Sequence, residues 1–365
     1  MIDGLGRPSY AVMNQPLRII DANFNRAVEG LRVVEDYARF LLNDATISGL
    51  LKEIRHQLTE AVSEFAGNRA DFRDTPGDVG TEISTDQEGS RESPLDVALA
   101  NLQRAQQSIR CIEEYGKILS SQFATRIEQL RYKVYSLQTP LARRVDQAAR
   151  LADAHLYVLV ECMDSTETFL KRVDELVSAQ VDVIQLRDKE APDRQLVERA
   201  RLAVQQTRQT ETIFIVNDRP DICVASGADG VHVGQDELAV ADARRIVGSD
   251  SLVGVSTHNV DQVRQAIIDG ADYIGCGPTF PSSTKTFDSF AGLDFLRQAS
   301  QITSLPAFAI GGIGLSNIDQ VVAAGFRRVA VQGAIESGDV ACVVRELKVR
   351  LANPVARVSG PSERN

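Results

Sequence analysis

Eight short apolar runs follow one another between residues 155 and 334, and amphipathic segments separate each run from the next. The runs occupy residues 155–160, 181–187, 212–218, 230–234, 252–257, 273–278, 306–312 and 328–334. Strands buried on both faces have this nearly continuous apolar character. Eight of them predict a (β/α)8 TIM barrel over residues 146–365. A doubly wound open sheet is the alternative, but it favours a glycine-rich turn after the first strand, where residues 160–165 offer none.

Polar residues follow the strands of the predicted barrel, at the end where such barrels hold their active sites. They include three cations, Arg187, Lys189 and Lys285, and the carboxylates of Asp218 and of residues 236–237. Charges of both signs at a barrel mouth indicate a polyanion that Mg2+ bridges to the protein. A weak surface ion pair explains any one of these residues equally well, but the whole set at strand ends favours a binding site.

Glycines after the seventh and eighth strands predict a phosphate site. Gly311 and Gly312 end the seventh run, and Gly333 follows Gln332 at the end of the eighth. Glycines at these two places in a barrel let backbone N–H groups approach a phosphate. We also expect Asn317, with the serine before it, to cap the helix that follows the seventh strand.

Two histidines fall on the predicted strands or at their ends. His232, within the fourth strand, is expected to be a hydrogen-bonded residue of the barrel core. For His258, after the fifth strand, a ligand contact and a structural role are equally good explanations. No pair of nucleophile and base is recognisable, so the sequence gives no indication of covalent catalysis.

The N-terminal region contains a duplication, because residues 22–41 and 100–119 share one frame at an offset of 78 residues. Apolar residues recur in both copies at steps of three and four, which predicts an all-α helical bundle of two helix pairs over residues 1–145. Salt bridges between helices explain the shared polar residues best, since Arg and Glu three apart pair readily. A polar ligand site between the helices is the alternative. The shared residues are Asn23/Asn101, Arg26/Arg104, Arg32/Arg110 and Glu35/Glu113.

A polar segment at residues 70–96 separates the two copies and is predicted to be a loop. Its Arg73, Asp74, Thr75 and Asp78 suit a phosphate or a metal ion. A solvated linker explains the same residues equally well.

Composition limits the partners and the compartment. The 365 residues are enough for two domains, and the net charge of −10 argues against nucleic acid or a membrane surface as a partner. The five cysteines are scattered, which favours buried, reduced thiols over a metal cage. The N-terminus lacks an apolar signal segment, and no run approaches about 18 apolar residues, so we expect a cytoplasmic protein. The sequence leaves open whether the chain is a homo-oligomer.

The barrel resembles the thiamine-phosphate synthase family in five stretches. They are QLRDK, VNDRPDICVASGADGVHVGQDEL, GVSTHN, ADYIGCGPTFPSSTKT and AIGGIGLSNIDQVVAAG, and they cover nearly the whole barrel in order. The resemblance implies that 4-amino-5-hydroxymethyl-2-methylpyrimidine diphosphate condenses with a thiazole phosphate to give thiamine phosphate and diphosphate. It also implies that diphosphate leaves first and that the thiazole nitrogen then traps the pyrimidine methylene cation. Cations and Mg2+ would stabilise the leaving group, and the site would exclude water.

The resemblance also assigns the site residues. The pyrimidine diphosphate would contact Gln185, Arg187, Lys189, Asn217, Ser256 and Lys285, of which Arg187, Lys189, Ser256 and Lys285 are the catalytic set. Mg2+ would be held by Asp218 and by Asp236 or Glu237. The thiazole phosphate would contact Ser282, Ser283, Thr284, Gly311, Gly312, Gln332 and Gly333.

Two positions depart from the family pattern. Glu237 stands where the family usually has Asp, so either Glu237 or Asp236 could ligate the metal. Gln332 and Gly333 stand in the segment VQGAI, where the family commonly has a serine before Ala-Ile. A backbone contact to phosphate tolerates that change, whereas a hydroxyl contact is lost.

The N-terminal region resembles the helical domain fused to such synthases in some bacteria, which implies that it makes or binds the pyrimidine phosphate. No Walker-type loop supplies a nucleotide site. Two other functions compete with the synthase. A thiazole tautomerase on the same barrel would have no use for Arg187, Lys189, Asp218 and Lys285. A sensor of phosphorylated heterocycles without catalytic activity is the other.

Overall fold

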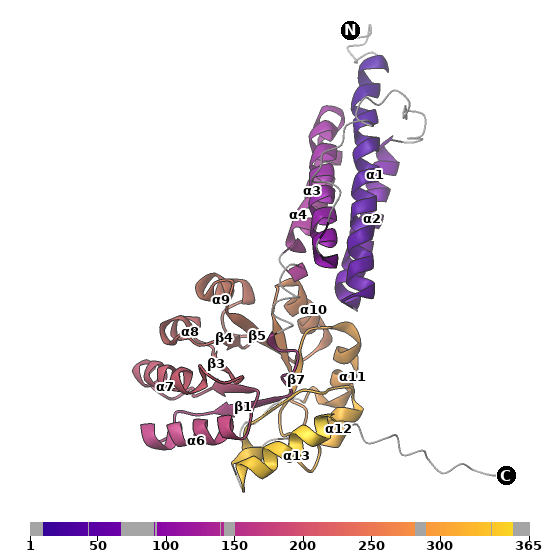
Figure 1. The fold of residues 1–365 in the computed structure, drawn as a ribbon. Helices are drawn as coiled ribbons and strands as arrows, with labels where there is room; N and C mark the ends of the chain where they lie inside the picture. The colour runs from indigo at the N-terminus through magenta and orange to yellow at the C-terminus, as the bar shows by residue number, and fades with distance from the viewer. Residues whose placement is uncertain are drawn as a thin grey trace, which may run out of the picture. The chain divides into compact units, whose positions relative to one another are not determined.

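The computed structural model describes residues 10–42, 44–66, 91, 93–138, 140–141, 150–281, 290–336 and 338–352. Contacts divide the chain into two compact units, Met1–Val145 and Asp146–Asn365 (Figure 1). Within the described residues, no helix is long and apolar enough to cross a membrane.

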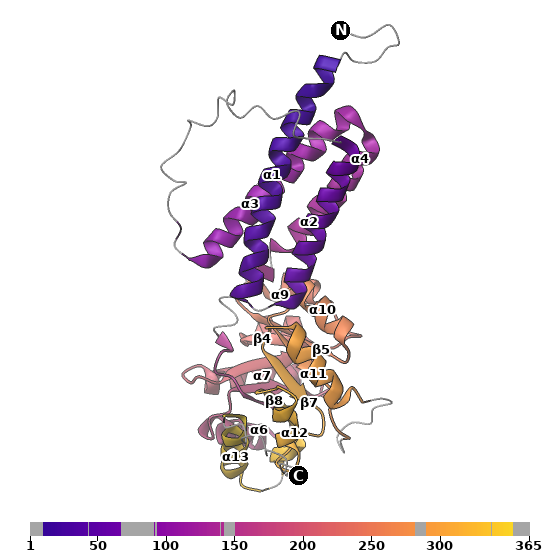
Figure 2. The same ribbon diagram turned by 90° about the vertical axis from the view of Figure 1, so that its right-hand side faces the viewer.

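The first unit is a bundle of two helix pairs, as the duplication predicts (Figure 2). Its helices are α1 (Tyr10–Phe40), α2 (Ala45–Ala66), α3 (Pro94–Leu119) and α4 (Ser121–Ser136). The long helices α1 and α3 pack along each other. Helix α3 begins six residues before the repeated segment because Ser93 caps it. The Ser93 hydroxyl accepts from the Asp96 backbone N–H at 3.1 Å, and Pro94 occupies the first turn.

The second unit is a closed barrel of eight parallel strands in sequential order, which confirms the predicted fold. Each strand lies within its predicted run. The strands are β1 (Leu156–Val160), β2 (Val183–Leu186), β3 (Ile213–Asn217), β4 (Gly230–Val233), β5 (Leu252–Thr257), β6 (Tyr273–Cys276), β7 (Ala307–Ile310) and β8 (Val329–Val331).

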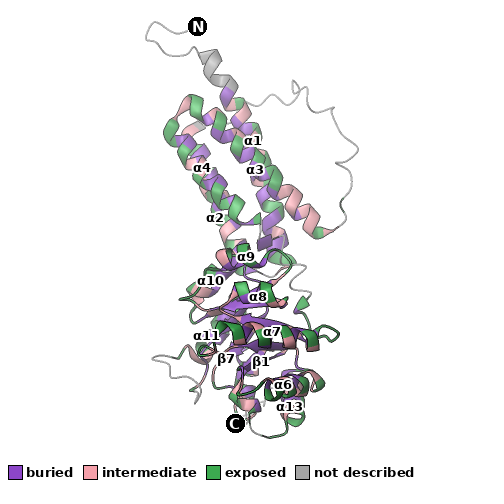
Figure 3. Cartoon of the chain, turned by 90° about the vertical axis from the view of Figure 1, so that its left-hand side faces the viewer, coloured by how far each residue is buried: buried purple, intermediate pink, exposed green. Residues whose placement is uncertain are grey.

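Helices alternate with the strands and surround them, so that the strands are buried and the outer helix faces are exposed (Figure 3). They are α6 (Thr166–Ser178), α7 (Asp193–Thr207), α8 (Pro220–Ser226), α9 (Val240–Val247), α10 (Val260–Ile268), α11 (Gly292–Ile302), α12 (Ile318–Ala323) and α13 (Val340–Ala352), with a 3-10 turn, η3 (Gly333–Ile335), after β8.

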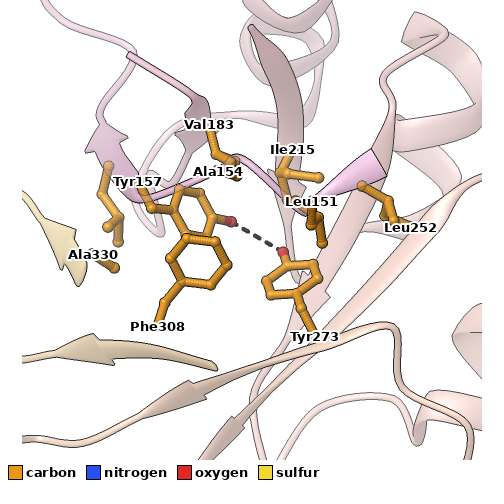
Figure 4. Packing of buried hydrophobic residues seen from close by; sticks show 10 residues of the cluster. Leu151, Ala154, Tyr157, Val183, Ile215, Leu252, Tyr273, Phe308 and Ala330 are labelled. Atoms are coloured by element: carbon orange, nitrogen blue, oxygen red, sulfur yellow. Dashed lines mark hydrogen bonds between the residues drawn. The ribbon is translucent and has the colours of Figure 1, made fainter. Parts of the chain in front are cut away.

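Aromatic rings fill the barrel interior. Tyr157, Tyr273 and Phe308 meet edge to face, with ring centroids 5.2 to 6.0 Å apart (Figure 4). Gly254 makes room for one of them, because a Cβ at this position would lie 2.1 Å from Cζ of Tyr273. Apolar burial alone does not explain two tyrosines here, since a buried hydroxyl needs a hydrogen-bond partner.

Three polar residues, Asn217, His232 and Ser256, lie at or near the carboxyl ends of the neighbouring strands β3, β4 and β5. Asn217 pairs with His232 across β3 and β4, and Ser256 pairs with Gly275 across β5 and β6. All the strands are parallel, so their carboxyl ends meet at one rim.

Candidate active site

A cavity of about 470 Å³ opens at the carboxyl ends of the strands. Its walls come from both ends of the barrel sequence, because β1 pairs with both β2 and β8 in the closed sheet. This volume suits a small phosphorylated ligand. Six of the predicted site residues line it, namely Arg187, Ser256, Gly311, Gly312, Gln332 and Gly333.

One end of the cavity is a glycine turn after β7. Gly311 and Gly312 have φ angles of 100° and 63°, which side chains disfavour. A Cβ on Gly311 would lie 2.7 Å from Cα of Pro278, and a Cβ on Gly312 would lie 2.3 Å from the Pro281 carbonyl oxygen. Only glycine therefore lets this turn pack against the loop after β6.

Asn317 occupies the N-cap position of α12, as predicted, but its side chain makes no capping hydrogen bond and shapes the glycine turn instead. Its Oδ1 accepts from the Gly314 N–H at 2.9 Å, and its Nδ2 donates to the Gly312 carbonyl at 2.8 Å. The side chain is thus used to close the loop. Across the cavity, η3 begins at Gly333. A short extra helix after β8 is a recurrent part of phosphate sites in such barrels.

Two carboxylates converge on one ammonium group at the rim. Nζ of Lys189 lies 3.4 Å from Oδ2 of Asp218 and 3.2 Å from Oε1 of Glu237. Burial opposes the charge, but the two carboxylates outweigh it and raise the pKa of Lys189. Asp218 has a φ of 60° and receives a 2.6 Å hydrogen bond from Nδ2 of Asn217. A non-glycine residue in the left-handed region is uncommon and directs attention to function.

The same carboxylates fit Mg2+. This ion binds one or two protein carboxylates and completes its octahedron with waters and substrate phosphate oxygens. Glu237 shares Lys189 with Asp218, whereas Asp236 is exposed and forms no ion pair with any described residue. The described residues contain no cluster of three or more His, Cys, Asp or Glu side chains suited to a metal. A Mg2+ site does not need such a cluster when two carboxylates bind the ion and substrate phosphate and water fill the other coordination positions.

A chain of hydrogen bonds runs through the barrel interior to the cavity. Nε2 of Gln185 donates to the Tyr157 hydroxyl at 2.9 Å, and this hydroxyl lies 3.1 Å from that of Tyr273 (Figure 4). The Tyr273 hydroxyl lies 3.3 Å from Nδ1 of His232. Nε2 of His232 lies 3.0 Å from Oγ of Ser256, on the cavity wall. His232 is thus a hydrogen-bonded core residue, as predicted.

Protonation gives this chain a direction. Burial, and secondly the charge of Arg187, lowers the pKa of His232 to about 4, so the ring is neutral near pH 7. With Gln185 donating to Tyr157, we assign the Tyr157 hydroxyl as the donor to Tyr273 and the Tyr273 hydroxyl as the donor to Nδ1 of His232. Nε2–H of His232 then donates to Ser256. Both tyrosine hydroxyls and the ring N–H are used in this arrangement, and the Ser256 hydroxyl remains free to donate to a ligand in the cavity.

Comparison with known proteins identifies the family to which the chain belongs. The profile described as "Thiamine monophosphate synthase" matches residues 156–335, and the ThiD2 family profile matches residues 18–140. The thiamine-phosphate synthase of Rhodopirellula baltica is 48% identical over 335 residues, which cover 88% of this chain and 89% of the relative. The chain belongs to the thiamine-phosphate synthase family.

Another family member and a solved structure extend the match. The thiamine-phosphate synthase of Gloeobacter violaceus is 40% identical, over 88% of this chain and 93% of the relative. The structure of thiamine phosphate pyrophosphorylase from Pyrococcus furiosus superimposes with a TM-score of 0.50 at 29% identity. It covers 56% of this chain and 98% of that one. The matches to the two synthases thus extend over both units of this chain, whereas the Pyrococcus furiosus structure has about the extent of one unit.

The remaining predicted site residues differ in where the fold places them. Gln185 is 3% exposed and belongs to the interior chain of hydrogen bonds. His258 lines the cavity, and its Nδ1 also lies 2.6 Å from the Gly277 carbonyl oxygen, so both of its proposed roles stand. Four predicted residues lie outside the described residues, and so does the loop with Arg73 to Asp78. The four are Ser282, Ser283, Thr284 and Lys285.

Sequence reasoning missed Tyr157 and Tyr273. Their signal was present, because each is a tyrosine within an otherwise apolar strand, where a hydroxyl must find a partner. The prediction for the cysteines was only partly correct. All five are free, and Cys162, Cys223 and Cys276 are buried, but Cys342 is exposed.

In the helical unit, salt bridges account for the duplicated glutamates. Arg55 of α2 lies 3.1 Å from Glu35, and Arg131 of α4 lies 2.7 Å from Glu113. Burial opposes ionisation of Glu113, but Arg131 and its other cationic partners outweigh it and lower its pKa. Arg110 adds a bond of 2.8 Å to Glu113 from the preceding turn. The favoured explanation, structural pairing, therefore holds for Glu35 and Glu113.

Proposed function

We propose that residues 146–365 join 4-amino-5-hydroxymethyl-2-methylpyrimidine diphosphate to a thiazole phosphate, giving thiamine phosphate and diphosphate. One observation carries the proposal. A single cavity has a glycine turn at one end and Arg187 and Ser256 on its wall, and Lys189 with two carboxylates stands at the same rim. Two anionic substrates need such a site. The names of the relatives, thiamine-phosphate synthases, support the same reaction.

Each end of the site has its own task in this proposal. Backbone N–H groups around Gly312 and Gly333 hold the thiazole phosphate. Arg187 and Lys189 hold the diphosphate and neutralise the charge that develops as it leaves. Asp218 and Glu237 would hold Mg2+, which would supply further positive charge to stabilise the leaving diphosphate.

The bond changes balance without a proton transfer. The bond between the pyrimidine methylene carbon and the diphosphate oxygen breaks, and its electron pair leaves with diphosphate. The thiazole nitrogen lone pair then forms the new C–N bond, which leaves a positive charge on the ring. Ser256 keeps its proton and donates a hydrogen bond to the departing anion, because Nε2–H of His232, 3.0 Å away, is assigned as the donor to the serine oxygen. Apolar walls from Leu159, Ile310 and Val331 reduce the access of water to the cation.

Product formation tests the reaction. The purified full chain is incubated with both substrates and Mg2+, and thiamine phosphate is measured after oxidation to a fluorescent thiochrome. We expect product only when all three are present. Isomerised thiazole phosphate without product would identify a tautomerase instead. Binding of thiazole phosphate with no reaction at all would identify a sensor.

The choice of metal ligand has its own test. We expect Asp218→Asn and Glu237→Gln each to raise the Mg2+ concentration for half-maximal activity at least about tenfold, since each removes one anionic ligand. Asp236→Asn is the matched control and should leave the Mg2+ dependence unchanged. The reverse pattern, with Asp236 sensitive and Glu237 insensitive, would overturn the assignment.

For residues 1–145 we propose that they bind or make the pyrimidine phosphate. The match to the ThiD2 family and the duplicated polar frame support this role. Incubation of the full chain with pyrimidine monophosphate and ATP, followed by chromatography of the pyrimidine products, distinguishes its two forms. The diphosphate appears if the unit makes it, and binding without conversion leaves the monophosphate unchanged. Absence of both binding and conversion contradicts the proposal.

A further inference from the structure

The helical unit contains a cavity of its own, of about 570 Å³, between α1 and α3. Its lining repeats the duplication. Asn23 of α1 and Asn101 of α3 are equivalent positions at the 78-residue offset, and both line it. The same holds for Arg26 with Arg104 and for Gly30 with Ser108. The cavity thus receives matching residues from the two copies and lies where they face each other.

The helices are close together beside this cavity. A Cβ on Gly30 would lie 2.8 Å from the Asn101 carbonyl oxygen and 3.4 Å from Cβ of Ala105, so only glycine permits this approach. The two asparagine amides are fixed by the preceding turns. Asn23 donates to the Ile19 carbonyl at 2.9 Å, and Asn101 donates to the Val97 carbonyl at 2.8 Å. The polar lining is therefore held in place.

Arg26 and Arg104 differ from the other shared arginines of this unit. Arg110 pairs with Glu113, but neither Arg26 nor Arg104 forms an ion pair with any described residue. Arg104 makes a long contact of 3.5 Å to Oδ1 of Asn101. One glutamate, Glu29, also lines the cavity, and its equivalent in the second copy is Gln107. The lining carries a net positive charge in a chain whose net charge is −10.

We propose that this cavity binds a phosphate monoester, with the phosphate dianion between Arg26 and Arg104. Guanidinium groups form charge-assisted, frequently paired hydrogen bonds with phosphate, and asparagine amides add neutral contacts. The volume matches a small heterocycle that carries one phosphate. The site deepens the proposed role of residues 1–145, and its assignment to pyrimidine monophosphate rests on that role.

The absence of tryptophan from the sequence allows a local test. Val33 lines the cavity and is 36% exposed, so Val33→Trp in the full chain places the only indole at this site. We expect saturable fluorescence changes with pyrimidine monophosphate. In the same background, Arg26→Gln and Arg104→Gln should each raise Kd at least about tenfold. Lys52→Gln on α2, an exposed residue outside the cavity lining, is the charge-matched control and should leave Kd unchanged.

A tryptophan at position 33 adds bulk to the cavity, so binding is also measured by calorimetry on chains that keep Val33. The wild-type chain should bind one more equivalent of the monophosphate than the Arg26→Gln/Arg104→Gln double variant does. The double variant should still make thiamine phosphate from supplied pyrimidine diphosphate at the wild-type rate. Equal binding by both chains would overturn the site. Binding of ATP but not of the monophosphate would overturn the assignment of the ligand. Binding without conversion to the diphosphate would leave the site intact and remove only a kinase role.

Discussion

Tyr273→Phe tests the directed chain of hydrogen bonds that ends at Ser256. The change removes one hydroxyl and leaves two buried partners unsatisfied, Tyr157 at 3.1 Å and His232 at 3.3 Å. Each unsatisfied buried group costs about 1–3 kcal/mol, so we expect the barrel to lose about 2–6 kcal/mol of stability. His232 is then free to take the other tautomer, in which Ser256 must donate to the ring. Ser256 thereby loses its hydrogen bond to the departing anion, which should lower kcat/KM by about 10- to 100-fold.

Two assays separate the structural effect from the catalytic one. Hydrogen exchange in peptides from β4 and β6 reports the opening free energy of the barrel by itself. Steady-state kinetics of the single variants Tyr273→Phe and Ser256→Ala and of the double variant then report coupling. If the tyrosine acts through Ser256, it has little further effect on kcat/KM in the Ser256→Ala background. Independent, additive losses would refute the reasoning.

Three further perturbations follow from the structure. Gly312→Ala forces a Cβ to 2.3 Å from the Pro281 carbonyl, so the Kd for thiazole phosphate, measured by calorimetry, should rise at least about tenfold. Because the pKa of His232 is about 4 in the fold and about 6.5 in the unfolded chain, the unfolded state takes up the proton first. Barrel stability from hydrogen exchange should therefore fall by about 3 kcal/mol as the pH drops from 6.5 through 4, and NMR should show a neutral ring at pH 5. Glu113→Ala removes the 2.7 Å partner of the buried Arg131 and leaves it a contact of 3.8 Å to Glu128, so it should cost about 3–5 kcal/mol in chemical denaturation of the helical unit; an equal loss in a Glu113→Met/Arg131→Met chain would argue against the pair.

The fold was predictable because each unit repeats one simple period. Eight apolar runs place the strands of the barrel, and steps of three and four place the helices of the bundle. The ends of these elements were less predictable, since capping sets them. Ser93 starts α3 before the repeated segment, and Asn317 gives its side chain to a loop instead of to α12.

The site was predictable only as far as strand ends reveal it. Lys189, Asp218 and Glu237 meet because parallel strands share a rim, which the sequence implies. The interior chain through Tyr157 and Tyr273 depends on barrel closure and register, which join residues 116 positions apart. The cytoplasmic location, the absence of a nucleic-acid partner and the role of the residues from Ser282 to Lys285 stay predictions.

Stoichiometry under single-turnover conditions tests the central claim most directly. The full chain in excess is mixed with pyrimidine diphosphate, thiazole phosphate and Mg2+, and diphosphate and thiamine phosphate are measured in the same quenched samples. We expect the two products to appear in equal amounts at every time point, and neither to form after chelation of the metal. Diphosphate release without thiamine phosphate, or conversion of the thiazole phosphate with no diphosphate released, would contradict the proposed synthase reaction.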